Sequence, residues 1–294
     1  MSMRTTTFRN VLQGICRHDG LDYEQIDNVQ LDFAEYVNER LREAWTWEWW
    51  PETMLIEQRQ YRDDYSGSVT YALDDIVWDP SGKKYYKALT AGESGNALSN
   101  AAKWSDSLGE WDRYIAYEQT GKTKYGDVKG VYERNPRKNT TPGRLNYEMS
   151  ENGIQASSLA GNQVFVEFRK RPPEFTGVLY DNTTANYYVD DLVWDEGTTA
   201  GAQNSGNCYI CIQAHTNSPA RTPDNASYWT KVDFPWILRS FVVRAAYCDF
   251  LAADGQTGKS IAEERRAFEH LEHAADAIGL PQQGEIASVG TVFC

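Results

Sequence analysis

The sequence predicts an α+β fold: a helical bundle built from the N- and C-terminal helices, a β-rich middle, and two small inserted β modules. Three observations support this prediction. Both chain ends carry apolar residues at helical spacing, the middle holds short runs of β-branched and aromatic residues, and one motif occurs twice. A chain of 294 residues is long enough for one large domain or for two to three small ones.

Two helices are expected within residues 5–50. The first has one apolar face, formed by Phe8, Val11, Leu12 and Ile15. Gly20 is expected to end it. The second helix should begin near Asp27 and end before Pro51. Its apolar face is formed by Phe33, Val37, Leu41 and Ala44.

The end of the second predicted helix carries a tryptophan cluster: Trp45, Trp47, Trp49 and Trp50. Tryptophan is enriched among the residues that contribute most to protein–protein binding. These four residues are therefore the candidates for an interface between subunits.

A third helix is expected near the start of the C-terminal part. Asp233 and Pro235 fit a helix start, because Asp is a good N-cap and Pro is tolerated in the first turn. The apolar face of this helix is formed by Leu238, Phe241, Val242 and Ala245. A glycine-rich turn over residues 254–258 should end it.

A fourth helix follows that turn. Ser260 and Glu263 match a capping box, S-x-x-E, at its start. Gly279 and Pro281 match a helix end. The tail, residues 282–294, is then expected to be extended.

The middle of the chain is expected to form β-strands. Four segments have strand composition: residues 54–59, 114–117, 128–132 and 164–168. Pro172 and Pro173 should end the last of them, because proline cannot donate a ladder hydrogen bond.

An internal repeat is the most informative feature. Residues 71–79 (YALDDIVWD) match residues 187–195 (YYVDDLVWD). The first copy closes with residues 100–105 (NAAKWS) and the second with residues 225–230 (NASYWT). The second copy is longer, with its extra loop expected over residues 196–207. Matches at both ends with a variable middle predict a duplicated module.

The repeats lie inside the chain, which suggests that each is inserted into a turn of a host domain. The expected domains are 1–61 with 233–294 as the helical part, 62–110 as module 1, 111–178 as the β middle, and 179–232 as module 2. Within the modules, Tyr85-Tyr86 is aligned with Tyr209-Ile210.

Each module resembles the chitin- and cellulose-binding modules of families 5 and 12. The matching segments are residues 75–78, 84–88 and 103–104 in the first copy and 191–194, 208–212 and 228–229 in the second. A module this small must bury aromatic rings to be stable. Its expected core residues are Trp78, Trp104, Trp194 and Trp229. The candidates for exposed stacking on a sugar face are Tyr85, Tyr86, Tyr209 and Tyr228.

The rest of the chain resembles the head-to-tail adaptor proteins of tailed bacteriophages. The resemblance rests on the helix pair with its tryptophan-rich end, the C-terminal helices, and the segments 128–136 and 164–173. It implies a structural virion protein at the head–tail junction, made in the host cytoplasm. Such a protein forms a ring, usually of twelve subunits, between the portal protein and downstream tail or neck proteins. Its C-terminal segment typically reaches into the portal.

The charge of the chain fits a surface past which DNA moves without specific binding. The formal net charge is −13, whereas phosphate binding needs clustered Lys and Arg. Simple solubility is the alternative explanation for that charge. No apolar run approaches the ~18 residues of a membrane span, and no secretory signal is visible. The five cysteines, an odd and scattered number, are expected to be reduced thiols.

Catalytic and cofactor chemistry is not expected. Residues 253–260 fit a relaxed phosphate-loop pattern, but a predicted helix precedes them where a strand is required. Cys208 and Cys211 should face opposite sides of a strand, which argues against zinc. His270 and His273 lie on a charged, solvated helix face. We therefore predict neither an enzyme nor a bound cofactor or metal.

Two alternatives to the adaptor remain. One is a carbohydrate-binding virion protein, such as a tail fibre or decoration protein, that attaches to glycan on the host surface. The other is an enzyme of unrecognised class that uses a carboxylate pair, for which Asp74-Asp75 and Asp190-Asp191 would be candidates. A turn that enters a strand is the simpler reading of both acid pairs.

Overall fold

A computed structural model describes residues 4–20, 23, 29–119, 121–156, 161–181, 186–196, 206–216, 218 and 220–289, with side chains up to residue 278. The chain divides into two units. Unit 1 contains Met1–Thr53 and Pro172–Cys294, and unit 2 contains Met54–Arg171. The described residues form α-helices and small antiparallel sheets, which confirms the α+β class.

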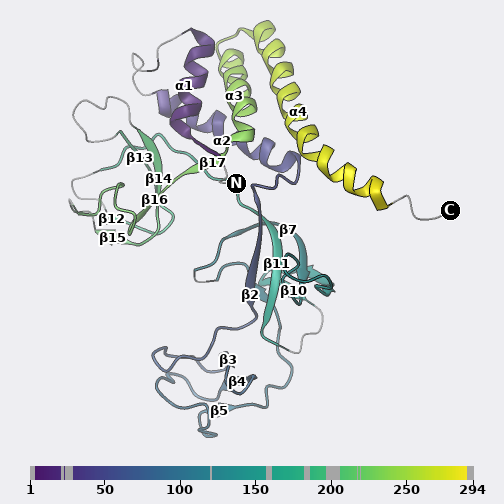
Figure 1. The fold of residues 1–294 in the computed structure, drawn as a ribbon. Helices are drawn as coiled ribbons and strands as arrows, with labels where there is room; N and C mark the ends of the chain where they lie inside the picture. The colour runs from purple at the N-terminus through teal and green to yellow at the C-terminus, as the bar shows by residue number, and fades with distance from the viewer. Residues whose placement is uncertain are drawn as a thin grey trace, which may run out of the picture. The chain divides into compact units, whose positions relative to one another are not determined.

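Unit 1 contains the helices of both chain ends (Figure 1). They are α1 (Phe8–Asp19), α2 (Val29–Trp47), the short 3₁₀ helix η2 (Trp236–Leu238), α3 (Arg239–Ala253) and α4 (Thr257–Val289). Helix α3 contacts α1, α2 and α4. The four α-helices share one apolar core, whose members include Phe8, Leu12, Leu41, Phe241, Leu251 and Leu271.

Helix α1 begins and ends where local sequence signals place it. Thr7 is the N-cap, and its hydroxyl accepts a hydrogen bond from the Asn10 N–H. Gly20 is the C-cap, with a φ of 75° that glycine adopts without strain. Gly14 lets α1 approach α3 closely, since a Cβ there would lie 2.9 Å from the methyl groups of Val243.

The expected start of the third helix is wrong. Residues Asp233–Pro235 form strand β17, which pairs antiparallel with β1 (Thr5–Thr7). Helix α3 begins only at Arg239, after η2. The N-terminal segment supplies a strand partner for residues 233–235, and this long-range pairing overrides the local helix signal.

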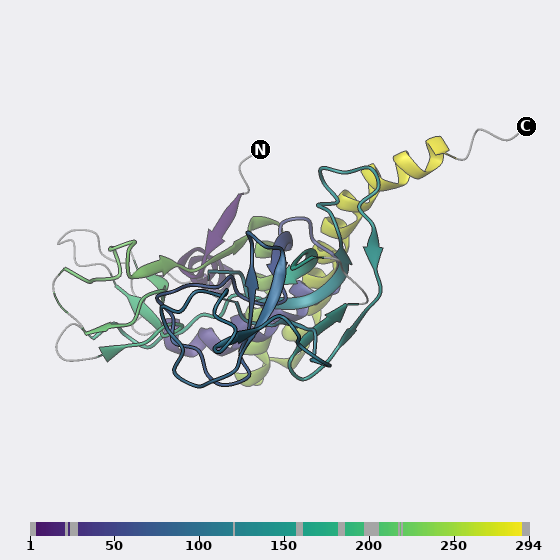
Figure 2. The ribbon, with the colours of Figure 1, turned by 90° about the horizontal axis from the view of Figure 1, so that it is seen from below.

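Both expected ends of the fourth helix are also wrong. Helix α4 starts at Thr257, and the hydroxyl of Ser260 donates to the Cys248 carbonyl at 3.0 Å instead of capping the helix. The helix continues through Gly279 and Pro281 to Val289, so residues 282–289 are helical and not extended. Glycine and proline lower helix propensity without forbidding a helix. The distal end of α4 runs past the other helices (Figures 1 and 2).

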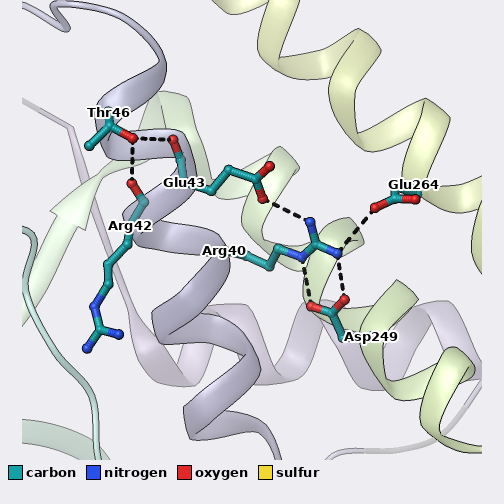
Figure 3. Close-up of polar contacts among 6 residues, drawn as sticks. All are labelled: Arg40, Arg42, Glu43, Thr46, Asp249 and Glu264. Atoms are coloured by element: carbon teal, nitrogen blue, oxygen red, sulfur yellow. Dashed lines mark hydrogen bonds and ion pairs between the residues drawn. The ribbon is translucent and has the colours of Figure 1, made fainter.

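A polar network joins three helices of unit 1 (Figure 3). The guanidinium of Arg40 on α2 donates from Nε and Nη2 to both oxygens of Asp249 on α3, at 2.7 and 2.6 Å. It also contacts Glu43 at 2.9 Å and Glu264 on α4 at 3.3 Å. These carboxylates raise the pKa of Arg40, first through the hydrogen bonds that Asp249 accepts from it. The arginine therefore stays charged and ties α2, α3 and α4 together.

Unit 1 also contains the second copy of the repeat. Its strands are β12 (Asn186–Tyr187), β13 (Leu192–Asp195), β14 (Asn207–Cys211), β15 (His215–Thr216) and β16 (Trp229–Lys231). They form a three-stranded sheet in the order β13-β14-β16 and a two-stranded pair, β12-β15. The expected loop over residues 196–207 lies mostly outside the described residues.

Unit 2 contains the first copy and the β middle. The first copy has β3 (Ile76–Asp79), β4 (Lys84–Ala88) and β5 (Trp104–Ser105). A four-stranded sheet has the order β2 (Met54–Gln60), β11 (Gln163–Lys170), β7 (Tyr125–Tyr132) and β8 (Arg144–Leu145). A three-stranded sheet has the order β6 (Ile115–Ala116), β10 (Gly153–Ala156) and β9 (Tyr147–Met149). Each of the four segments expected to be strands in the middle of the chain contains one, although in residues 114–117 only Ile115–Ala116 is a strand.

Candidate functional site

The two copies of the repeat share the same hairpin register. Trp78 pairs with Tyr85 in the first copy, and Trp194 pairs with Cys208 in the second. Tyr85 therefore corresponds to Cys208, and Tyr86 to Tyr209. The sequence alignment of Tyr85-Tyr86 with Tyr209-Ile210 was wrong by one residue.

The acid pairs of the repeat form a turn in both copies. Asp74 and Asp190 have positive φ values of 70° and 77°. The carboxylate of Asp75 accepts the Ala72 N–H at 2.6 Å, and Asp191 makes the same contact at the same distance. These carboxylates hold backbone, as expected for a turn.

Each module has an aromatic core of three rings. The first copy uses Tyr65, Tyr71 and Trp104, and the second uses Tyr180, Tyr187 and Trp229. In each, two tyrosines stack on one another and the tryptophan meets both in an edge-on arrangement. The sequence reading missed Tyr65 and Tyr180, because they precede the matched segment at spacings that differ by one residue.

The other two tryptophans of the repeat are buried at the base of each module. Trp194 is 2% exposed and packs edge-on against Phe8 of α1, with ring centroids 5.7 Å apart. Trp78 is 8% exposed and packs on Tyr85, 4.6 Å away. Tyr85 in turn contacts Trp111 of the β middle. Trp104 and Trp229 thus belong to the aromatic cores of the modules, as expected. Trp78 and Trp194, which were also expected there, lie instead where each module joins the rest of its unit.

The four tyrosines expected to stack on sugar are half-buried. Tyr85 is held by Trp78 and Trp111, and its hydroxyl lies 3.2 Å from the Gly161 carbonyl. The remaining three pack against the module cores: Tyr86, Tyr209 and Tyr228. Small modules need these rings for their own stability, so they do not form flat exposed platforms.

One exposed aromatic ring was missed by the sequence reading. In the described parts of the modules, the exposed aromatic side chain is that of Tyr188, at 66%. It lies in the turn that precedes the second acid pair. The corresponding residue of the first copy is Ala72, so the repeat itself gave no reason to select Tyr188.

Both modules present aliphatic side chains at equivalent positions. Leu73 and Leu89 are 53% and 40% exposed in the first copy. Val189 and Ile212 are 54% and 47% exposed in the second. Each pair adjoins residues whose backbones are hydrogen-bonded across the module, namely Asp74 to Ala88 in the first copy and Asp190 to Cys211 in the second. Exposed apolar pairs of this kind suit contact with another protein.

The tryptophan cluster divides into buried and exposed members. Trp45 and Trp50 are 3% and 0% exposed, and the Trp50 indole N–H donates to the Ala44 carbonyl at 2.7 Å. These two are core residues, so their selection as interface candidates was wrong. Trp47 and Trp49 are 45% and 38% exposed, and Trp47 also contacts Phe268 of α4. Only the exposed pair is placed to contact another subunit.

A cavity of about 400 Å³ lies in unit 2, beside the turn of the first module. Its wall includes four carboxylates: Asp63, Asp74, Asp75 and Glu118. The guanidinium of Arg62 lies over the Tyr114 ring at 4.6 Å, and burial lowers its pKa. No serine, cysteine or histidine is among the described residues that line the cavity. The polar groups of the cavity wall are thus mainly carboxylates, together with the Arg62 guanidinium and two tyrosine hydroxyls.

The cysteines of β14 face opposite sides of the strand. The Cys208 thiol lies in the core of unit 1, where it donates to the Thr176 carbonyl at 3.2 Å. Cys211 lies in the core of module 2, with its sulfur 3.8 Å from His215 Nδ1. Within the described ranges, no three His, Cys, Asp or Glu side chains are placed to hold a metal ion.

The buried thiols should resist alkylation in the folded chain. Burial raises the pKa of both Cys208 and Cys248 to about 12, and the thiolate is the reactive form. Iodoacetamide at pH 8 should label neither residue until guanidinium unfolds the protein, as measured by peptide mass spectrometry. Because folding raises these pKa values, the stability they confer is present below about pH 9 and is lost as the pH rises towards 12. Rapid labelling of Cys208 in the folded chain would contradict this prediction.

In the part of the chain that the structure describes, no helix has the length and apolar character needed to cross a membrane. Comparisons of the chain with protein-family models, with curated proteins and with solved structures found no match.

Proposed function

We propose that the chain is a structural subunit of a head-to-tail adaptor ring in a tailed bacteriophage, joining the portal protein to the tail around the DNA exit channel. The observation that carries this proposal is the shared core of the two chain ends. Helices α1 and α2 pack with α3 and α4 although more than 180 residues separate them in sequence. A core shared by the two chain ends supports the helical bundle, with the modules as insertions, that the adaptor resemblance implies.

Helix α4 supplies the arm that such an adaptor needs. It has 33 residues, which corresponds to about 50 Å at 1.5 Å per residue. Its first half packs on the core through Ala267 and Leu271. We assign the distal half, which runs past the other helices (Figure 2), to contact with the portal.

The surface chemistry agrees with a passive channel. The net charge of −13 disfavours retention of DNA. We therefore propose a structural role without a cofactor, at the head–tail junction of a virion assembled in the host cytoplasm. The aliphatic pairs of the modules would contact neighbouring virion proteins.

Electron cryomicroscopy of particles of the phage that encodes the chain tests this proposal. The expected result is a ring of this fold beneath the portal, with copy number fixed by mass spectrometry and close to twelve per particle. The proposal fails if the chain is absent from purified particles or is found at the distal tail. Heads that keep DNA and bind tails without the chain would also refute it.

A carbohydrate-binding virion protein is the second candidate, and the exposure of Tyr188 favours it. An exposed tyrosine can stack on the apolar face of a sugar. We expect Tyr188→Ala to weaken binding to a chitin or host-polysaccharide column at least tenfold, with Tyr86→Ala as a control for a packed ring. Equal retention of both variants and the wild type, or no retention at all, would remove this candidate.

A further inference from the structure

An arginine surface lies where α1, α3 and the N-terminal strand meet. It consists of Arg4 and Arg239, whose guanidinium groups lie over the half-buried ring of Trp236, and of the exposed Arg17 of α1, which is close enough to Arg239 to lower its pKa. Among the described residues, none of these arginines has a carboxylate within the 4.0 Å of an ion pair. Other arginines of unit 1, such as Arg40, Arg42, Arg244, Arg265 and Arg266, do have one.

The arginine surface is held together by specific contacts. The guanidinium carbons of Arg4 and Arg239 lie 4.1 and 5.1 Å from the Trp236 ring centre. Arg239 also donates to the Asn10 carbonyl of α1 at 2.9 Å. Arg17 follows Asn10 by seven residues, so it lies on the same helical face. Burial, and then Arg17, lowers the pKa of Arg239. Positive charge is thus gathered in a chain that is acidic overall.

An acidic stripe lies on the exposed face of α2. Asp32, Glu35 and Glu39 are exposed and follow one another at spacings of three and four residues. Such spacings place like charges side by side on a helix, which destabilises it in isolation. In the described structure none of the three has an ion-pair partner, whereas Glu43 of the same helix is bonded to Arg40. The exposed side chain of Leu31 adjoins the stripe.

We infer that the arginine surface of one copy of this chain docks on the acidic stripe of a second copy. The two surfaces match in charge, and Trp236 and Leu31 add an apolar group to each. Both belong to unit 1 and lie on different elements, so each copy offers one surface of each kind and copies can join head-to-tail. Repeated head-to-tail contacts form a ring when the rotation between neighbouring copies closes, and an open filament when it does not. The inference rests on the proposed adaptor function and names the surfaces through which the ring would form.

Paired charge reversal tests this contact. One variant carries Arg4→Glu and Arg17→Glu, and the other carries Glu35→Arg and Glu39→Arg. A control carries Glu272→Arg and Asp276→Arg, two exposed acids of α4, and its change in charge equals that of the Glu35→Arg and Glu39→Arg variant. Arg239 is kept, because it holds α1 to α3. Circular dichroism and thermal unfolding show whether each variant folds as the wild type does.

Sedimentation velocity at low and high salt is the measurement. We expect the wild type and the control to self-associate at low salt and to dissociate as salt is added. Each reversal variant alone should associate at least tenfold more weakly. Mixing the two variants, or combining all four changes in one chain, should restore association, because opposite charges face each other again.

Four results would overturn the inference. They are a wild type that stays monomeric at high concentration and low salt, association that the reversals leave unchanged, a control that fails like the variants, and a mixture that does not recover. If Arg4→Glu and Arg17→Glu abolished DNA binding and left self-association unchanged, the arginine surface would be a phosphate-binding surface instead. If the reversal variants associated as the wild type does and the chain still formed a ring in the virion, only this contact would be refuted. If the chain were absent from the virion, only the adaptor function would be refuted.

Discussion

Replacing Arg40 with alanine is expected to lower the free energy of unfolding of unit 1 by about 2–3 kcal/mol. The side chain is 17% exposed and makes charged hydrogen bonds to both oxygens of Asp249. Its removal leaves Asp249, itself 22% exposed, beside Glu43 and Glu264 with no cation between them. Three carboxylates of like charge would then meet at the junction of α2, α3 and α4 (Figure 3). Chemical denaturation with helical circular dichroism as the signal measures the loss.

Arg42→Ala is the matched control for this prediction. Arg42 lies two residues away on the same helix, but it is 53% exposed and its partner Glu174 is 55% exposed. Solvent screens such a pair, so we expect a loss below about 1 kcal/mol. Equal losses for the two variants would show that the Arg40 network does not join the helices. Arg40→Lys should recover only part of the stability, since lysine cannot bind both oxygens of Asp249 in a fork.

Local signals in the sequence predicted the elements whose stability is local. Gly20 ends α1 because a positive φ is needed there, and the four strand segments of the middle have β-branched and aromatic composition. The acid pairs of the repeat were read as turns, and the structure holds them in turns. For the helix end and the turns, the decisive interactions lie within a few residues of one another, whereas the strands were recognised from their composition although their pairing partners are distant in sequence.

Long-range interactions explain what the sequence did not predict. Residues 233–235 form a strand because Thr5–Thr7 pairs with them, and no local pattern reports a partner so far away. Trp45 follows Leu41 by four residues and so belongs to the buried face of α2, but it was not assigned to that face from the sequence. Trp50 follows the end of the helix, where helical periodicity no longer predicts which side chains are buried. Arg40 and Asp249 are 209 residues apart, so neither could be selected as part of a network.

The candidate binding surfaces also include residues that the sequence predicted and residues that it did not. The repeat was visible because its two copies share residues, and shared residues proved to be those that build the module. Residues that differ between the copies were not selected, although one of them, Tyr188, is the exposed ring. An internal repeat therefore predicts the fold that its copies share, but not the residues that each copy exposes on its surface.

The two copies of the repeat are also attached to different parts of the chain, the second to the helices of unit 1 and the first to the β middle of unit 2. Trp194→Ala should lower the free energy of unfolding of unit 1 by about 3–5 kcal/mol, as expected for a buried tryptophan. Its ring lies in the helical core, edge-on to Phe8, with Gly206 against its face. Hydrogen exchange should accelerate in α1 as well as in β13 and β14.

Trp229→Ala is the comparison that separates attachment from module folding. Trp229 is equally buried, at 2%, but its neighbours Tyr180 and Tyr187 belong to module 2 itself. Its loss should accelerate exchange in β14 and β16 while α1 remains protected. If both variants gave the same exchange pattern, module 2 and the helices would unfold as one cooperative body. If Trp194→Ala left α1 protected, the packing of Trp194 against Phe8 would not be what holds module 2 to the helical core.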